Sequence, residues 1–352
     1  NGIKMKHNKG MAQQSDLISA IPLPALIINA DGRIATANTM MSALFGLNLA
    51  GLSHITVLRK PALLDAIEAA KQDKIERKTK YLGHDGARET SYDVSITPVA
   101  DQVVVIFEDI SAAAEIEKFR RDFIANVSHE LRTPLTSLLG FIETLQGPAR
   151  DDRIAQQRFL SIMSQEADRM RQLVDDLLSL SRVEEDERIR PQDQVDFSLI
   201  VPSVIEGLQP LADAANLNLV FEVTAGSKMV LGDDFQLRQI LSNLMSNAIK
   251  YGASSKGVRV NVSGPRHDPA LQGESITIEV RDFGEGVALH HIARLTERFY
   301  RVDSHRSREV GGTGLGLAIV KHIVSRHRGR MLIESDLGQG TTFKVILPAI
   351  LK

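Results

Sequence analysis

The sequence contains no cysteine, and its positive and negative charges almost cancel. Without cysteine the chain cannot form a disulfide, a thiol nucleophile or a zinc–thiolate site, so catalysis must use other groups. The formal net charge is -2, which gives no overall positive field to neutralise the phosphates of a nucleic acid. We therefore expect no direct binding of nucleic acid.

Long hydrophobic runs are also missing. The longest stretch without Asp, Glu, Lys or Arg runs from Ile34 to Leu58, and polar residues and glycines interrupt it. It lacks the hydrophobicity that a membrane-spanning helix requires. The opening residues, NGIKMKHNKG, are basic and show no pattern, so we interpret residues 1–10 as a tag or a disordered segment.

The 352 residues are 43% hydrophobic and 24% charged, which is typical of a folded chain with several modules. Residues 15–110 contain short apolar runs, and Asp31-Gly32 between two of them predicts a β-hairpin. The later runs SYDVSITPV and QVVVIFED predict strands. This order of hairpin, short helices and three strands resembles a PAS domain, and we interpret it as an α/β sensor module.

Residues 111–185 show helical periodicity. Apolar residues recur at steps of three and four on either side of a break at Gly147-Pro148, which predicts an antiparallel helical hairpin. The two helices alone would leave much of these apolar stripes uncovered. Two hairpins would cover them in a four-helix bundle, so we expect a homodimer.

The run EEDER in residues 184–188 followed by Pro191 predicts a solvated linker over residues 186–196. Residues 197–352 then read as a mixed α/β sandwich, with helices at about 199–215 and at 234–251. The segments LNLVFEV, VRVNVSG, SITIEVRD, GRMLIESD and TTFKVILP predict its strands. Helices should cover one face of this sheet, and the fold class is multidomain α+β.

The segment SHELRTPL at residues 128–135 lies on the first long helix. His129 is two residues from both Val127 and Leu131, so it points about 200° away from the apolar stripe, toward solvent. Glu130 could accept a proton from the imidazole, and the Thr133 hydroxyl one turn later could orient a water. An exposed histidine alone is usually an ordinary surface residue.

These eight residues resemble the phosphoacceptor box of two-component sensor histidine kinases. The resemblance implies that His129 is phosphorylated, that Glu130 is its activating base, and that Thr133 supports dephosphorylation of the partner. Pro134 should also kink or loosen the helix just below the site.

Three further segments contain residues suited to a nucleotide. In NLMSNAIKY, Asn243, Asn247 and Lys250 share a helix face, where amide oxygens could bind a cation and Lys250 a phosphate. In DFGEGV, Gly284 and Gly286 allow close approach to a planar base, and the glycines of GGTGLGLAIV suit phosphate at a helix N-terminus. Each segment alone also fits a polar helix face or a plain turn.

In order, NLMSNAIKY, DFGEGV, RFYRVD and GGTGLGLAIV resemble the N, G1, F and G2 boxes of the histidine-kinase ATP-binding domain, which is related to the gyrase and heat-shock-chaperone ATPases. This resemblance implies that Asn247 binds Mg²⁺, that Asn243 supports catalysis and that Asp282 binds the adenine amino group. It further implies nucleotide contacts by Lys250, Tyr251, Gly284, Gly286, Arg301, Gly312, Thr313, Gly314, Leu315 and Gly316. The segment between Gly286 and Gly312 would be a lid, with Phe299 packing it onto the domain.

Two positions depart from the family pattern: Phe283 stands where Asn often follows the Asp, and Arg328 stands where glycine is common. Thr341 and Thr342 resemble a final glycine-threonine element or a plain turn. The resemblance implies a dimeric kinase that phosphorylates His129 with ATP and Mg²⁺, passes the phosphoryl group to a response regulator receiver domain, and also dephosphorylates that regulator.

Of known types, the phosphate-regulon sensor kinase is the most similar. We expect the chain to be the cytoplasmic portion of a protein that upstream segments would anchor in the inner membrane, with a small molecule or protein as the signal at residues 15–110. Two alternatives stay open from the residues alone: an ATPase of the gyrase, chaperone or mismatch-repair type, and a degenerate kinase that serves as a scaffold. SHELRTPL argues against the first, and Asn247 and Asp282 argue against the second.

Overall fold

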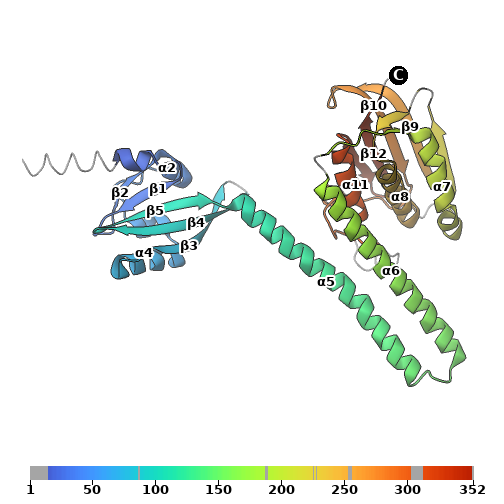
Figure 1. The fold of residues 1–352 in the computed structure, drawn as a ribbon, viewed down its shortest axis with the longest axis horizontal. Helices are drawn as coiled ribbons and strands as arrows, with labels where there is room; N and C mark the ends of the chain where they lie inside the picture. The colour runs from blue at the N-terminus through green and yellow to red at the C-terminus, as the bar shows by residue number, and fades with distance from the viewer. Residues whose placement is uncertain are drawn as a thin grey trace, which may run out of the picture. The chain divides into compact units, whose positions relative to one another are not determined.

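The computed structural model describes residues 15–85, 88–186, 189–224, 226, 228–252, 256–302 and 312–350 (Figure 1). The expected tag at residues 1–10 and residues 303–311 of the expected lid lie outside this part of the chain. The chain divides into two compact units, residues 1–125 and 126–352.

The first unit contains a five-stranded antiparallel sheet in the order β2-β1-β5-β4-β3. Its strands are β1 (Ala25–Ile28), β2 (Ile34–Ala37), β3 (Arg77–Asp85), β4 (Arg88–Val99) and β5 (Gln102–Asp109), and its helices are α2 (Thr39–Phe45), α3 (His54–Leu58) and α4 (Pro61–Asp73). The predicted hairpin is confirmed, since β1 pairs with β2 across a turn in which Gly32 has a φ of 80°. The order of a hairpin, helices and three strands is confirmed as well.

The core of this unit is mainly aliphatic and contains a small group of aromatic rings. Along β5 the alternate residues Val103, Val105 and Phe107 are buried, as the two-residue period of a strand requires. The Phe107 ring packs against those of Tyr81 and Tyr92 at centroid distances of 5.3 and 5.9 Å. Such close ring packing specifies a well-filled interior.

The helical hairpin predicted from the periodicity is confirmed by α5 (Ser111–Gln146) and α6 (Arg153–Glu185). Gly147 and Pro148 lie in the turn, and the carboxylate of Asp152 accepts hydrogen bonds from two backbone N–H groups at the start of α6. Pro134 lies inside α5, which continues past it as one helix.

Much of the apolar stripe of this hairpin is exposed in the single chain. The large hydrophobic side chains left open to solvent on the two helices are Ile116, Phe119, Ile124, Leu135, Leu139, Ile142, Ile154, Leu160, Val174 and Leu178. So many exposed large apolar side chains on one hairpin favour an interaction face.

The second unit also contains a five-stranded sheet, in the order β11-β12-β10-β9-β7, in which only the β7–β9 pair is parallel among the described strands. The strands are β7 (Leu219–Val223), β9 (Val258–Asp268), β10 (Gly273–Arg281), β11 (Arg330–Asp336) and β12 (Gly340–Pro348), and the helices are α7 (Phe197–Ala214), α8 (Asp234–Tyr251), α9 (Leu289–Ile292) and α11 (Gly316–Arg326). A small pair, β6 (Gln194–Asp196) with β8 (Met229–Leu231), was not predicted.

The core of this part lies between one face of the sheet and the helices. Alternate residues of β9 and β10, such as Val260 and Ile278, are fully buried, and the buried residues of α8, such as Leu241, complete the same interior. The predicted α/β sandwich is therefore confirmed. Because one side of α8 is used for this core, its other side is left for polar groups.

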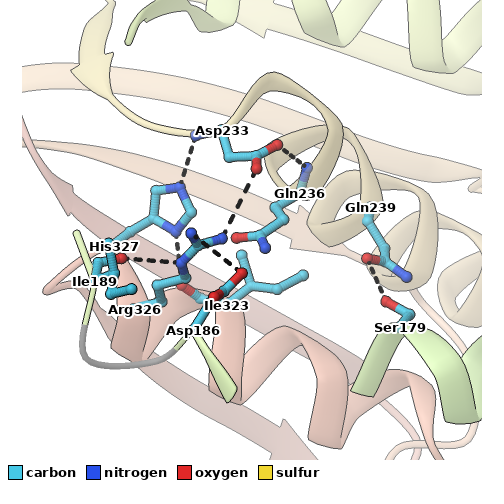
Figure 2. A network of polar contacts seen from close by, with 9 residues as sticks. All are labelled: Ser179, Asp186, Ile189, Asp233, Gln236, Gln239, Ile323, Arg326 and His327. Carbon is cyan, nitrogen blue, oxygen red and sulfur yellow. Dashed lines mark hydrogen bonds and ion pairs between the residues drawn. The ribbon is translucent and has the colours of Figure 1, made fainter. Parts of the chain in front are cut away.

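The end of α6 is attached to this α/β part through Arg326, the last residue of α11 (Figure 2). The Arg326 Nε donates to the backbone oxygen of Ile189 at 3.0 Å, and its terminal nitrogens lie 3.7 Å from Asp186 and 3.8 Å from Asp233. His327 accepts a hydrogen bond from the Asp233 N–H at 3.1 Å through its Nε2. Asp186 and Ile189 of the expected linker thus contact α11, while the Ile189 side chain stays exposed to solvent.

Candidate functional site

His129 lies on an exposed part of α5, as its helical phase predicts. The hydroxyl of Thr133 donates a hydrogen bond to the backbone oxygen of His129 at 3.2 Å, so it is held along the helix. Pro134 has no N–H to donate to the backbone oxygen of Glu130 four residues earlier. These residues border a cavity of about 390 Å³.

The cavity is formed by both hairpin helices and by the segment that precedes residue 302. Its lining consists of His129, Glu130, Thr133, Pro134, Ser137, Glu166, Arg169, Phe299, Tyr300 and Arg301. The sequence pattern did not single out Ser137, which lies two residues after the recognised box, or Glu166 and Arg169, which lie on the other helix.

Glu130 pairs with arginines in this structure. Its Oε2 accepts a hydrogen bond from Arg301 at 3.0 Å and lies 3.7 Å from Arg169. In the described part of the chain the His129 ring makes no hydrogen bond, so the expected contact between Glu130 and the imidazole is not present. Its role as the base of the reaction stays a prediction.

Arg301 lies close to the phosphoacceptor helix because residues 299–301 pack against the second glycine segment. The N–H of Phe299 donates to the backbone oxygen of Gly314 at 2.8 Å, and a Cβ on Gly314 would lie 2.9 Å from the Cα of Phe299. The side chain of Arg301 is 9% exposed, and its Nε has no hydrogen-bond partner among the described residues. This nitrogen is a buried donor available to an anion.

The predicted polar face of α8 lies next to the start of α11. The side-chain amide of Asn243 donates to the backbone oxygen of Gly316 at 3.3 Å. Asn247 is half-buried one turn later, and within the described residues its side chain makes no hydrogen bond. Burial lowers the pKa of Lys250, while the charge of Asp176 acts in the opposite direction.

Asp282 follows β10 and is 4% exposed. Its Oδ1 accepts the N–H groups of Gly284 at 2.9 Å and of Thr341 at 3.1 Å, while burial raises the pKa of its carboxyl group. Its Oδ2 could accept a hydrogen bond from a ligand. The sequence left open whether Thr341 belongs to a plain turn or to a glycine-threonine element. In the structure its backbone N–H contacts the candidate adenine-binding carboxylate.

Close backbone packing explains why this segment contains glycine. A Cβ on Gly284 would lie 2.1 Å from the backbone oxygen of Tyr251, and one on Gly286 would lie 2.1 Å from that of Asp336. Gly286 also has a φ of 68°, a conformation that side chains with a Cβ rarely adopt. A larger residue at either position would displace the wall that carries Asp282.

In the second glycine segment, Thr313 and Leu315 are buried and Gly312 and Gly316 are partly exposed. The Thr313 hydroxyl donates to Asp176 Oδ2 on α6 at 2.7 Å, and Gln172 donates to the other oxygen at 2.8 Å. Asp176 is 6% exposed, and burial raises its pKa. Sequence reasoning missed Asp176.

A signal for Asp176 exists in the sequence. At about 100° per residue it falls between Leu180 and Val183 on the apolar stripe of α6, and both of these are buried. A carboxylate within an apolar stripe is an informative exception, because buried acids need a partner.

The arrangement fits a nucleotide with a divalent cation. Asp282 offers a buried acceptor oxygen, Asn247 offers an amide oxygen and Lys250 offers a cationic donor, while the Thr313 hydroxyl donates to Asp176. No group of three or more His, Asp or Glu side chains within the described ranges could hold a metal by itself. Magnesium usually takes few protein ligands and completes its shell with water and phosphate, so the single amide is compatible with it.

Comparison with protein families identifies two segments of the chain. Residues 119–186 match the "His Kinase A (phospho-acceptor) domain", and residues 232–350 match the "Histidine kinase-, DNA gyrase B-, and HSP90-like ATPase". The chain belongs to the histidine kinase family. The two matched segments contain His129 and the three nucleotide segments of this histidine kinase.

Curated relatives include the sensor protein kinase WalK of Staphylococcus saprophyticus, 38% identical over 245 residues, which are 70% of this chain and 39% of that protein. WalK of Staphylococcus aureus is 36% identical over 246 residues, 70% of this chain and 57% of that sequence. This histidine kinase therefore spans about two fifths of the length of the first of these relatives.

Among solved structures, the histidine kinase ThkA in complex with the response regulator protein TrrA has a TM-score of 0.52 and 20% sequence identity. The similarity covers 96% of this chain and 98% of that one. At this identity it shows a similar fold. Within the described residues, no helix is both long and apolar enough to cross a membrane.

Proposed function

We propose that this chain is a sensor kinase that transfers the γ-phosphoryl group of ATP to His129 and then to an aspartate of a response regulator. The observation that carries the proposal is the cavity that is lined both by exposed His129 and by Arg301, a residue of the segment between the two glycine boxes. The matches to a phospho-acceptor domain and an ATPase domain in one chain support it.

The chemistry requires alignment more than covalent assistance. A ring nitrogen of His129 attacks the γ-phosphorus, the bond to the bridging oxygen breaks, and ADP leaves while a nitrogen–phosphorus bond forms. The proton on the other ring nitrogen would pass to Glu130, the proposed base. The charges of Lys250 and Arg301 would stabilise the phosphoryl group during transfer, and Asp282 would orient the adenine ring of ATP. Magnesium at Asn247 would supply charge neutralisation on the phosphates.

The second reaction of the proposal is transfer from His129 to a receiver-domain aspartate, followed by hydrolysis that Thr133 supports. ThkA was solved in complex with a response regulator protein, and this pairing favours such a partner here. A homodimer is proposed from the exposed apolar residues of the hairpin and from its match to the phospho-acceptor family.

The proposed domain division is a PAS-like sensor at 15–110, the hairpin at 111–185, the linker at 186–196 and the catalytic domain at 197–352. The antiparallel sheet of the first unit with its intervening helices supports the PAS-like part. The phosphate-regulon type, a signal at this module and an upstream membrane anchor stay predictions. Both curated relatives compared with the chain are WalK kinases.

Incubation with γ-labelled ATP and Mg²⁺ tests the function. Wild type should acquire label that is acid-labile and alkali-stable, whereas His129→Gln should acquire none and Asn247→Ala should acquire little. His84→Gln, which changes another exposed histidine, is the matched control and should label normally. Label that persists in His129→Gln, or that survives acid, would overturn the assignment.

A further inference from the structure

Several side chains that the proposed function assigns to phosphate are held by carboxylates of the hairpin. Arg301 donates to Glu130 of α5 at 3.0 Å, and Thr313 donates to Asp176 of α6 at 2.7 Å. Asp176 is also the carboxylate whose charge acts on the buried ammonium group of Lys250. The contacts come from two helices and reach three separate segments of the α/β part.

We propose that Asp176 is an internal ligand of the phosphate-binding groups, so that docking of α6 and binding of the nucleotide phosphates exclude each other. This inference rests on the proposed function, since it assumes that Thr313 and Lys250 bind the phosphates of ATP. A carboxylate resembles a phosphate in charge and in its acceptor oxygens.

The hydrogen-bond geometry makes the exclusion specific. A threonine hydroxyl has a single proton to donate, so Thr313 cannot donate to Asp176 and to a phosphate oxygen at the same time. Both oxygens of Asp176 are occupied, one by Thr313 and one by Gln172. A phosphate brought to Thr313 would also face the negative charge of Asp176 at close range.

The rest of the interface follows the same side of α6. One turn beyond Asp176, Ser179 donates to the side-chain oxygen of Gln239 on α8 at 2.9 Å (Figure 2). Further on, Glu184 pairs with Arg298 and lies 3.6 Å from His322 of α11. Asp176 therefore stands at one end of a continuous docking surface, and its loss should loosen that surface without removing it.

Binding of ADP in the presence of Mg²⁺, measured by calorimetry on the full chain, tests the exclusion. Asp176→Ala should bind ADP more tightly than wild type, about tenfold if the docked form accounts for about nine-tenths of the molecules. Asp175→Ala removes the neighbouring exposed carboxylate and should leave the affinity unchanged. Equal affinities of Asp176→Ala and wild type would overturn the proposal.

The absence of cysteine permits a second, independent test. In the double variant Ser179→Cys, Gln239→Cys, a cross-link between the two thiols holds α6 in the docked form. The cross-linked protein should bind ADP at least about tenfold more weakly than the same protein after reduction. The cross-linking experiment tests the exclusion even if Asp176→Ala fails to fold. An ADP affinity that does not change on cross-linking would refute the exclusion.

The two proposals fail in different ways. If ADP binds neither wild type nor reduced double variant, the assigned function is wrong and the inference fails with it. If ADP binds all forms equally, ATP use stands and only the competition is refuted.

Discussion

The hairpin and the α/β part of the same chain differ in how they bury apolar side chains. In the α/β part, residues such as Val260, Ile278 and Leu241 are fully buried by the sheet and its own helices. On α5, Leu135 and Leu139 remain 50% and 54% exposed. The α/β part buries its apolar side chains with its own residues, whereas the hairpin leaves apolar side chains exposed, which the proposed dimer would cover.

A charge among the exposed apolar side chains of the hairpin should have the largest effect. Leu135→Glu replaces an exposed apolar side chain in both copies of the proposed dimer, at a cost of about 3–6 kcal/mol. The dimer dissociation constant should rise at least about 100-fold, as measured by light scattering over a dilution series. Thr136→Glu adds the same charge about 100° away and should keep the dimer, and an unchanged mass for Leu135→Glu would contradict the model of a shared core.

A substitution in the α/β part should weaken nucleotide binding and leave the proposed dimer intact. Asp282→Ala removes a buried acceptor with a charge, so ADP affinity should fall about 10- to 100-fold. Calorimetry checks this, with Glu279→Ala on the same strand as the control. If Asp282→Ala bound ADP as tightly as wild type, the adenine ring would not contact Asp282.

Acid should destabilise the α/β part through His327. Its Nε2 accepts the Asp233 N–H, and burial lowers its pKa below the ordinary value of about 6.5. The unfolded chain then binds a proton at a pH where the folded chain does not, so stability is full above about pH 6.5 and is lost as pH falls toward the lowered pKa.

The total loss of unfolding free energy should be about 1.4 kcal/mol for each unit by which the pKa of His327 is lowered. Urea unfolding between pH 7 and 5 measures it. His327→Gln should flatten the dependence in that range, whereas exposed His267→Gln should not. Equal slopes in all three proteins would show that another group is responsible. Because this core is internal, the effect should not depend on protein concentration.

The smallest expected effect concerns Arg328, which has a φ of 57° just after α11. Glycine adopts this conformation without strain, so Arg328→Gly should raise the free energy of unfolding by about 0.5–1 kcal/mol. Lys321→Gly in the middle of α11 should lower it by about 1 kcal/mol. A destabilised Arg328→Gly would mean that its side chain makes contacts that outweigh the backbone strain.

Local patterns predicted the elements of both units well. The bounds of α8 agree with the expected 234–251, and Asp31-Gly32 and Gly147-Pro148 both fall in turns, because these signals depend on residues close in sequence. The β6–β8 pair was missed because short strands distant in sequence leave no periodic signal.

Site prediction was limited in the same way. Asn243 and Asp282 could be selected from motifs, and the structure finds them beside glycine segments. The pairing of Glu130 with Arg301 joins residues 171 positions apart, and that of Asp176 with Thr313 joins residues 137 apart, so no local motif contains either pair. Only the buried position of an acid on an apolar stripe hinted at Asp176.

Arg326 has a consequence for the proposed release of α6 from its docking surface. Its guanidinium contacts Ile189 and Asp186, on both sides of residues 187–188, and it is anchored in turn beside Asp233 (Figure 2). Release of Asp176 and Ser179 does not require loss of the hydrogen bond to Ile189. The α/β part would then pivot about this short tether, which restricts its search for His129 to an arc.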